Sequence, residues 1–253
     1  MIALLDKPQV AVRTVNTLRP LPLENGDRLT RAEFERRYDA MPNLRKAELI
    51  EGIVQMPSPI RIEHMEADLV ILTWLGVYVA ATPGVRGGGD GSVRLDADNE
   101  VQPDALLRID AACGGQSRVA ADGFIEGAPE LVVEISGSSA SYDLHTKMHV
   151  YRRAGVREYI VWRVYDRALD WFVLEEGRFV AQTTTDDQGI LSSRVFPGLR
   201  LPVMAMRDGK LAEVLAAVQQ GVQTPEHARF VTALSHVKPD VHEKVIMKER
   251  ITA

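Results

Sequence analysis

The sequence predicts an α/β (α+β) fold in which a mixed central β-sheet is flanked by helices. Residues 62–81 repeat apolar side chains at helical spacing, as a long core helix does. Residues 130–135 form a short β-branched run typical of a buried strand. A helical segment at 142–154 separates that run from another strand-like segment at 158–164. Such a strand–helix–strand unit beside antiparallel hairpins indicates a sheet with helices on its faces.

Composition and charge bound the class of protein. A chain of 253 residues that is 45% hydrophobic and 26% charged can bury one full core. The formal net charge of −5 excludes binding of nucleic acid through bulk basicity, so a polyanion would need a local basic patch helped by a metal. The single Cys113 excludes an intrachain disulfide and a CxxC zinc site, and it fits a reducing compartment.

No targeting or membrane signal is expected. The N-terminus lacks the basic start and sustained apolar stretch of a signal peptide. The longest uncharged run, residues 69–85, contains a Pro-Gly break and falls short of a membrane span. We therefore expect a soluble, cytoplasmic protein with no membrane partner.

The first elements follow from local signals. Residues 1–28 contain several prolines and no periodicity, which indicates an irregular N-terminal arm. A capping box at Thr30, with a glutamate three residues later, begins a helix that extends to about residue 41. Residues 48–56 alternate around a Glu-Gly pair, which predicts two short strands joined by a tight turn.

The middle of the chain is predicted to contain a loop, a hairpin and a second loop. No Gly-Lys-Ser/Thr follows the three glycines at 87–89, so a flexible connection is favoured over a phosphate-binding loop. Strand-like residues 92–96 and 100–107 flank a polar turn and predict a hairpin. Residues 111–128 are rich in small side chains and predict a loop.

The second half continues the α/β pattern. The helix at 142–154 stops at Gly155, a good C-cap. A further hairpin is predicted at 169–181, and a helix at 211–220. We assign one domain to residues 29–221, and residues 222–253 are expected to form a polar tail that is partly helical or disordered.

Two acids stand in apolar surroundings. Asp104 leads into Ala-Leu-Leu, and Glu134 lies between Val133 and Ile135 in the most hydrophobic strand. A carboxylate in such a place is desolvated unless it is paired or binds a cation. Two of them on adjacent strands could share one hard divalent ion, most plausibly Mg²⁺ that retains some of its waters. Taken singly, each is more often a solvated or salt-bridged residue at a strand end, because most acids are exposed.

A lysine on the following helix strengthens this interpretation. Asp143, Lys147 and Tyr151 share one helix face, and a helix that follows the Glu134 strand packs back across the sheet, so Lys147 can point at the carboxylates. Phosphodiester hydrolysis uses a metal ion to activate water and a cation to stabilise developing charge. The alternative for Asp143 and Lys147 is an exposed ion pair of small energetic effect.

Five ordered blocks of sequence carry a family resemblance: 47–59 with His64, 101–104, 129–135, 142–147 and 151–161. Together they resemble the Uma-type restriction endonucleases, formerly described as a domain of unknown function, of the PD-(D/E)XK nuclease superfamily. The resemblance covers roughly residues 30–200. It implies a restriction-endonuclease-like core with added antiparallel hairpins.

The resemblance also implies roles for individual residues. Asp104 matches the Asp of the motif and Glu134 its second acid. Ser136 occupies the usual position of the lysine, and Lys147 resembles the lysine that has migrated to the next helix in this family. Asp104 and Glu134, with the Ile135 carbonyl, would hold Mg²⁺, with Mn²⁺ as an alternative.

Two further residues match the family with less support. Glu51 matches an early acid that would support the metal or a second ion, although Ile53 stands where another acid is frequent. His64 matches a histidine that would touch water or phosphate, and its alternative is a structural hydrogen bond at a helix start.

The sequence also departs from the family at two turns. Residues 137–140 replace a Ser-Pro-Ser-Thr turn, and Trp162 and Arg163 replace an acid. Neither departure removes an expected metal ligand, but both could reshape the pocket.

The expected function is that of a metal-dependent endonuclease on nucleic acid, with DNA favoured over RNA. Arg152, Arg153 and Arg157 could contact phosphates, although each alone could be a solvated surface charge. A homodimer is plausible, since cutting both strands needs two sites. Two alternatives stay open: a catalytically weak or inactive binding or accessory protein, and a mobile-element or repair nuclease on branched or single-stranded substrates.

Overall fold

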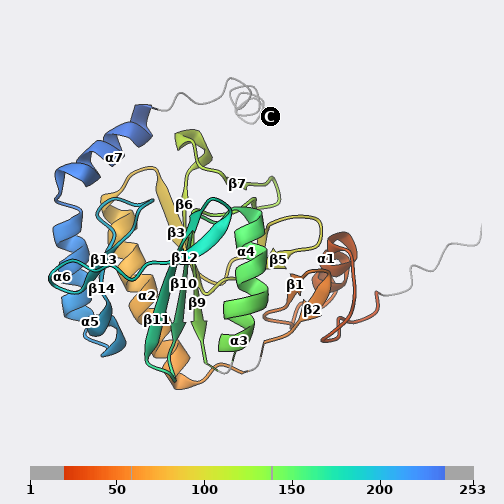
Figure 1. Cartoon of the computed structure of the whole chain (residues 1–253). Helices are drawn as coiled ribbons and strands as arrows, with labels where there is room; N and C mark the ends of the chain where they lie inside the picture. The colour runs from red at the N-terminus through yellow and green to blue at the C-terminus, as the bar shows by residue number, and fades with distance from the viewer. Residues whose placement is uncertain (1–19, 58, 138, 237–253) are drawn as a thin grey trace, which may run out of the picture.

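A mixed six-stranded sheet forms the centre of the computed structural model, which describes residues 20–57, 59–137 and 139–236 (Figure 1). Its strand order is β12-β11-β10-β9-β6-β3. The strands are β3 (Val85–Gly88), β6 (Ala105–Ile109), β9 (Leu131–Ser136), β10 (Glu158–Arg163), β11 (Ala168–Glu175) and β12 (Arg178–Ala181). β9 and β10 are parallel, and the other neighbours are antiparallel. The predicted mixed sheet is confirmed.

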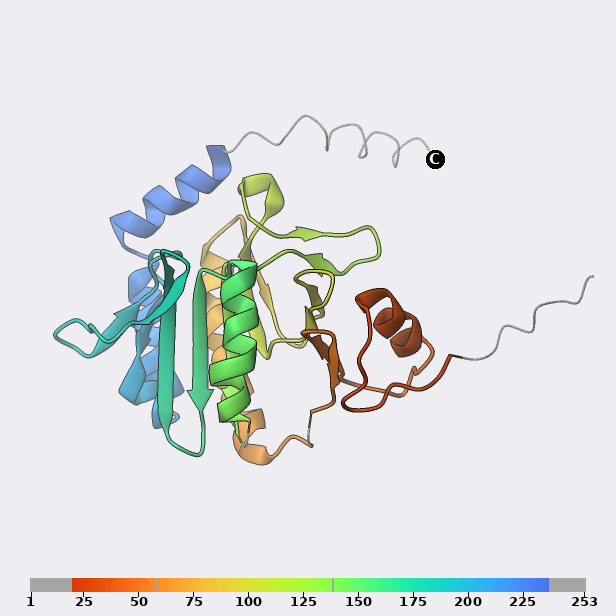
Figure 2. The same ribbon diagram turned by 45° about the vertical axis from the view of Figure 1, so that its right-hand side comes forward.

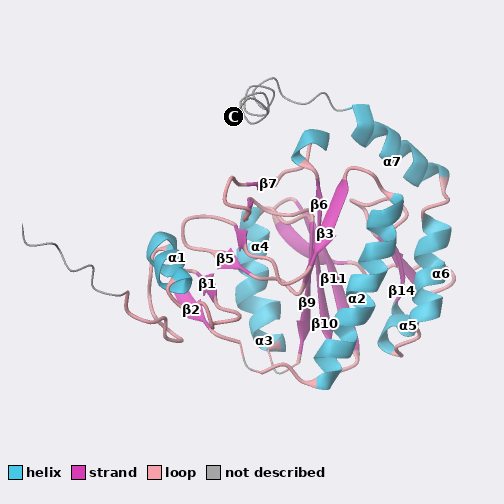
Figure 3. Ribbon diagram, turned by 180° about the vertical axis from the view of Figure 1, so that it is seen from behind, coloured by secondary structure: helices cyan, strands magenta, loops and turns pink. Residues whose placement is uncertain are grey.

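Helices cover both faces of this sheet. Figure 3 shows α2 (Ile62–Ala81) and α6 (Leu211–Gly221) over one face, with α4 (Met148–Ala154) behind the other. The side chains of β9 alternate between the two layers: Val133 packs in the α2 core, whereas Val132 packs in the α4 core. Both faces of β9 are therefore buried, which explains its unbroken apolar sequence.

The long helix α2 is the main support of the sheet. Its Trp74 side chain is fully buried and meets Trp171 of β11 edge to face, with ring centroids 6.1 Å apart. Its length and composition would also allow it to cross a membrane. Ile71, Leu75 and Tyr78 are buried in the protein, whereas Met65, Leu69 and Leu72 of the same helix are exposed.

A second six-stranded sheet, ordered β2-β1-β5-β4-β8-β7, lies beside the first (Figure 2). Its strands are β1 (Glu48–Ile50), β2 (Ile53–Gln55), β4 (Val93–Arg94), β5 (Glu100–Val101), β7 (Arg118–Val119) and β8 (Ile125–Glu126). The helix α1 (Arg31–Asp39), capped by the Thr30 side chain at the Glu33 amide, packs on it through the buried Phe34. The tight turn between β1 and β2 is thus observed. Of the expected capping box only the Thr30 bond is present, because the Glu33 carboxylate binds Arg36 and Arg37.

The remaining elements close the domain on the α2 side. They are the hairpin of β13 (Ile190–Ser192) and β14 (Arg200–Pro202), the short helix α5 (Val203–Arg207) and α7 (Pro225–His236). In α7, His227 and Leu234 are buried, and the His227 ring lies 2.9 Å from the Thr82 hydroxyl. The expected tail is therefore helical and packed over 225–236, while its residues 237–253, like residues 1–19 of the expected arm, lie outside the described residues.

Several expected segments differ from the structure. The glycines at 87–89 were expected in a loop, but Val85–Gly88 is a strand paired with β6. A Cβ on Gly87 would lie 2.8 Å from Leu107 Cδ2, so glycine is needed for the close approach of β3 to β6. In the sequence the same glycines suggest a loop. The loop expected at 111–128 contains a 3-10 turn (η1, Ala111–Cys113) as well as β7 and β8.

The hairpin expected at 92–107 is also only partly observed. β4 and β5 pair antiparallel around the polar turn, but the second arm breaks at residues 102–104. As a result β5 belongs to the small sheet and β6 to the large one. Pro103 lies in the break, where a missing N–H does not interrupt a ladder.

The helix expected at 142–154 is composite. It begins with α3 (Ala140–Tyr142), continues as a π-helical turn, η2 (Asp143–Lys147), and ends with α4. Gly155 terminates it in the left-handed conformation, φ 89°, with its N–H bonded to the carbonyls of Tyr151 and Arg152.

Two helical glycines provide a test of the packing. A Cβ on Gly221 would overlap the Gly198 carbonyl oxygen, whereas a Cβ on Gly76 has no neighbour within 4 Å. We expect Gly221→Ala to lower the free energy of unfolding by about 1–3 kcal/mol. Gly76→Ala, inside α2, should raise it by about 0.5–1 kcal/mol. Urea unfolding of both variants measures this, and equal effects would contradict the close contact.

Candidate active site

Asp104 lies where β6 begins, against the end of β9. Its Oδ2 accepts a hydrogen bond of 2.7 Å from the Ile135 N–H. The pairing of Ala105 with Val133, continued by one residue, sets Asp104 opposite Glu134. Because the chain leaves the ladder before β6, the Asp104 carboxylate is held by the β9 backbone. It lies beside Glu134, so the two acids of the expected site are brought together.

Glu134 is buried inside the protein together with a cation. The Lys147 ammonium lies 2.9 Å from Glu134 Oε1 and 3.0 Å from Glu48 Oε2. The Tyr151 hydroxyl donates to the same Glu134 oxygen at 2.7 Å, and the other Glu48 oxygen accepts from the Gln102 N–H at 2.7 Å. Glu48, Glu134 and Lys147 are each at most 5% exposed. Ionisable groups are tolerated at this depth because each has a partner.

The path of the chain explains why the lysine comes from the helix. Ser136, at the usual lysine position, is fully buried, and its hydroxyl donates to Asp143 Oδ2 at 2.5 Å. The Ser139 hydroxyl donates to the same oxygen at 2.7 Å. Asp143 therefore anchors the start of the helix to the end of β9, and Lys147 follows it in the same π-helical turn. Asp143 and Lys147 are both buried, which rules out the alternative of an exposed pair.

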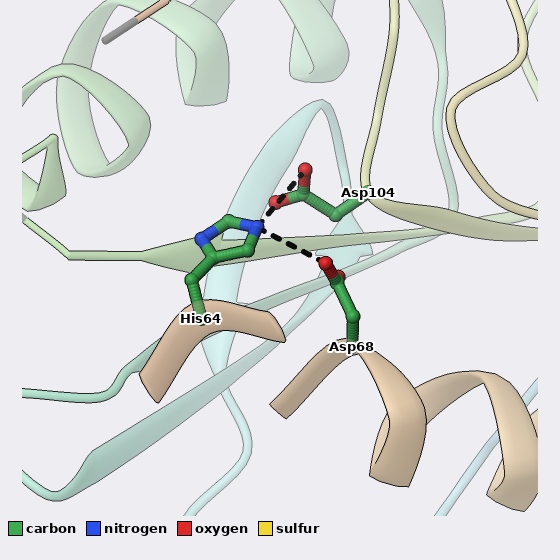
Figure 4. Close-up of side chains that lie close together, drawn as sticks. All are labelled: His64, Asp68 and Asp104. Atoms are coloured by element: carbon green, nitrogen blue, oxygen red, sulfur yellow. Dashed lines mark ion pairs between the residues drawn. The ribbon is translucent and has the colours of Figure 1, made fainter. Parts of the chain in front are cut away.

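A second group of side chains surrounds the other oxygen of Asp104. The Lys46 ammonium lies 3.2 Å and the His64 Nε2 atom 3.6 Å from Asp104 Oδ1. His64 Nε2 also lies 3.4 Å from Asp68 Oδ2, one helical turn further along α2 (Figure 4). Lys46 contacts the exposed Asp90 as well, at 3.3 Å. His64 thus lies beside Asp104.

Burial and neighbouring charges give the two aspartates of this group different pKa values. Burial raises the pKa of Asp104, but contact with His64 and the charge of Lys46 lower it overall to about 2. Burial raises the pKa of Asp68 to about 6, against the opposing charge of His64. The pKa of His64 is lowered by burial but raised overall by the carboxylates of Asp104 and Asp68.

Glu134 and Lys147 form a tightly coupled pair. Burial raises the pKa of Glu134 to about 8, since Lys147 lowers it less than burial and the nearby Asp104 and Glu48 raise it. Burial lowers the pKa of Lys147, but Glu134 and Glu48 hold it well above its usual value. The lysine is therefore charged, and the carboxylates around it outnumber the ammonium groups. A site with excess buried acid favours a further cation or a proton.

The structure separates Glu51 from this cluster. Glu51 occupies the turn between β1 and β2 with a positive φ of 52°, and it pairs with Arg153 at 3.2 Å on the surface. Glu48, three residues earlier, contacts Lys147 instead. Glu48 could not be predicted as a site residue from the sequence. All three residues of β1 are buried, so no alternation marks the side chain that faces the site.

Lys46 and Asp68 were also not predicted from the sequence, and no contact was predicted for the Tyr151 hydroxyl. Asp68 stands four residues after His64, the spacing that places two side chains on one helix face, so it could have been found. Lys46 precedes β1 without a local signal of its own.

The three arginines expected near phosphate bind protein groups. Arg153 pairs with Glu51, Arg152 donates to the Gly177 carbonyl at 2.8 Å, and Arg157 donates to the Gln116 side chain at 3.1 Å. Among the described contacts, none of them reaches the buried acids.

The two departures from the family pattern are local. Arg163 pairs with Asp166 at 2.6 Å and with Asp170 at 2.8 Å. Gly137 lies against the Tyr165 ring, where a Cβ would approach to 3.3 Å. Neither Arg163 nor Gly137 contacts Asp104, Glu134 or Glu48 in the described hydrogen bonds and ion pairs, but Ser139 of the same turn binds Asp143.

Comparison with known proteins gives a family and a fold. A family model described as Uma2, putative restriction endonuclease, matches residues 31–204, more than half of the chain. The crystal structure of a putative nuclease belonging to DUF820 from Anabaena variabilis ATCC 29413 is similar, with a TM-score of 0.52 and 12% identity. The alignment covers 75% of this chain and 99% of that chain. No curated protein matches.

Removing the buried ammonium should destabilise the protein. Lys147→Met would leave Glu134 and Glu48 buried without their cation, so we expect the free energy of unfolding to fall by about 3–5 kcal/mol. Chemical denaturation of the metal-free protein measures this. Lys210→Met, at an exposed lysine, is the control and should change stability by less than about 0.5 kcal/mol. Equal stability of the two variants would show that Lys147 is not buried as described.

The raised pKa of Glu134 also predicts a pH dependence. The folded state keeps its proton up to about pH 8, whereas the unfolded carboxyl releases it near 4.5. The stability from Glu134 is therefore present below pH 4.5 and is lost as the pH rises toward 8, by at most about 1.4 kcal/mol per unit. Unfolding in EDTA at several pH values should show this fall in the wild type and a shallower one in Glu134→Gln. Identical slopes would refute it.

Proposed function

The chain belongs to the Uma2 family of putative restriction endonucleases, and from this premise we propose that it is a metal-dependent nuclease that hydrolyses phosphodiester bonds, with DNA as substrate. One observation supports this most: the buried Lys147 ammonium contacts Glu134 and Glu48, with Asp104 fixed beside Glu134 by the Ile135 N–H. Acids and a lysine of this kind, gathered at one sheet end, are the groups that such chemistry needs.

Asp104, Glu134 and the Ile135 carbonyl are the proposed ligands of a divalent ion, with Mg²⁺ as the first choice and Mn²⁺ as the alternative. Oxygen ligands of this kind suit both ions, and the excess of buried carboxylates fits a bound cation. When bound, the ion would lower the pKa of a coordinated water and neutralise phosphate oxygens.

Lys147 and its partners have the next role. The ammonium orients the attacking water by hydrogen bonding and stabilises negative charge on the phosphate as it develops. Glu48 and the Tyr151 hydroxyl hold Lys147 and Glu134 in position, from β1 and α4. Because Glu48 contacts Lys147, the supporting role is proposed for Glu48 rather than for Glu51. His64, beside Asp104, is proposed to contact water or phosphate.

The substrate and setting follow from the family and the chemistry. We propose DNA rather than RNA, a cytoplasmic location, and a homodimer that brings two sites to the two strands. Because Arg152, Arg153 and Arg157 make protein contacts in the free chain, they would have to exchange these partners for phosphates on binding.

A catalytically inactive accessory protein is the second candidate. The observation that favours it is that Glu134 Oε1 already binds both Lys147 and the Tyr151 hydroxyl. That network satisfies one acid oxygen without a metal, so the fold could keep this arrangement for stability alone.

Cleavage of supercoiled plasmid and of single-stranded and branched DNA, with Mg²⁺ or Mn²⁺, separates the candidates. Asp104→Asn and Glu134→Gln should each lower the rate about 100-fold or more, as does the loss of a group that stabilises developing charge. Cleavage should stop in EDTA.

Glu158→Gln is the matched control for this assay. Glu158 is a fully buried acid at the opposite end of the neighbouring strand β10, where it binds the Ser193 hydroxyl and the Arg194 N–H. Its substitution should leave cleavage within a few-fold of wild type. Equal low activity in all four proteins would reject the nuclease and favour the accessory protein.

A further inference from the structure

Three side chains from two elements converge on one point on the α2 side of Asp104. His64 and Asp68 come from the first turns of α2, and Asp104 immediately precedes β6. One ligand atom from each lies within 4.8 Å of the other two. Figure 4 shows the His64 ring directed between the two carboxylates.

Hydrogen bonding does not account for this arrangement. His64 Nε2 is buried, yet it has no hydrogen-bond partner among the described residues. Its distances to Asp68 Oδ2 and Asp104 Oδ1 are 3.4 Å and 3.6 Å. A buried imidazole nitrogen without a hydrogen-bond partner is uncommon, because no hydrogen bond then compensates for its loss of contact with water. An ion between the three groups would satisfy it.

The geometry separates this point from the Glu134 side of the site. Asp104 Oδ2 is occupied by the Ile135 N–H, and Glu134 Oε1 by Lys147 and Tyr151. Asp104 Oδ1 faces His64 and Lys46 instead. A bound cation would repel the Lys46 ammonium.

Lys46 has an alternative partner when that happens. Its ammonium already lies 3.3 Å from Asp90, an exposed acid outside the three converging groups. Lys46 can therefore move toward Asp90 without losing all of its ion pairs, and Asp104 Oδ1 becomes available to the cation.

We propose, resting on the nuclease function above, that His64 Nε2, Asp68 and Asp104 bind a divalent transition-metal ion of the Mn²⁺ type. One imidazole nitrogen and two carboxylates suit first-row transition metals. Mg²⁺ demands oxygen ligands and retains its waters, so the nitrogen ligand disfavours it. The chain therefore prefers Mn²⁺ to Mg²⁺ at this position, and Asp104 links it to the Glu134 side.

Binding can be measured without nucleic acid, on the untagged full chain. Pulsed EPR of the Mn²⁺-loaded protein reports a ¹⁴N coupling when an imidazole is a ligand. We expect this coupling in the wild type and its loss in His64→Gln. His149→Gln, at an exposed histidine of α4, is the matched control and keeps the coupling. Circular dichroism shows whether each variant is folded.

A second variant tests the carboxylate. Asp68→Asn should raise the dissociation constant of Mn²⁺ about tenfold or more, since even the loss of a partner outside the ligand set costs roughly 10–100-fold. The shift should be smaller for Mg²⁺. Calorimetric titration of both ions gives the two constants.

The outcomes distinguish this site from the nuclease function. Absence of ¹⁴N coupling in the wild type, its persistence in His64→Gln, or an unchanged Mn²⁺ affinity in Asp68→Asn overturns the site, even if the protein cleaves DNA. Coupling that depends on His64 supports the site, even in a wild-type protein that cuts no substrate, and in that case only the nuclease function fails.

Discussion

The buried Lys147 ammonium is the interaction on which the rest of this structure depends. It joins Glu134 of the large sheet to Glu48 of the small sheet, and it reaches them from the helix that covers the large sheet. Three layers thus meet at one cation. Because a buried carboxylate without a counter-charge is costly, the small sheet cannot separate from the large one without exposing or stranding an acid. The pair that holds the fold is also the centre of the proposed chemistry.

Asp104 depends on a different constraint, the interruption of a strand. β5 and β6 are close in sequence but belong to different sheets, and the residues between them leave the ladder. The side chain of Asp104 replaces a backbone partner for β9. Its carboxylate therefore has one oxygen fixed and the other facing His64 and Lys46. One carboxylate therefore contacts both the β9 backbone and the group formed by Lys46 and His64.

Long periodic segments and the order of the elements could be predicted from sequence, because burial on one or two faces imposes the pattern that was recognised. The helix at 62–81 and the strand at 130–135 are examples. Contacts between elements could not be predicted from the sequence. No local feature of the sequence shows whether Glu48 or Glu51 faces the site across the tight turn. The glycines of β3 suggest a loop, because glycine is common both in flexible loops and where two strands pack closely. Lys147 could be predicted because its helix follows the Glu134 strand directly.

The π-helical turn at Asp143–Lys147 has a consequence for where the lysine points. A π turn holds one residue more than an α turn. In an ordinary helix each residue turns the chain by about 100°. Removing one residue from this turn would therefore rotate the helix that follows it relative to the sheet. The phase of this helix thus sets the position of the buried cation as strictly as the strand beside it does.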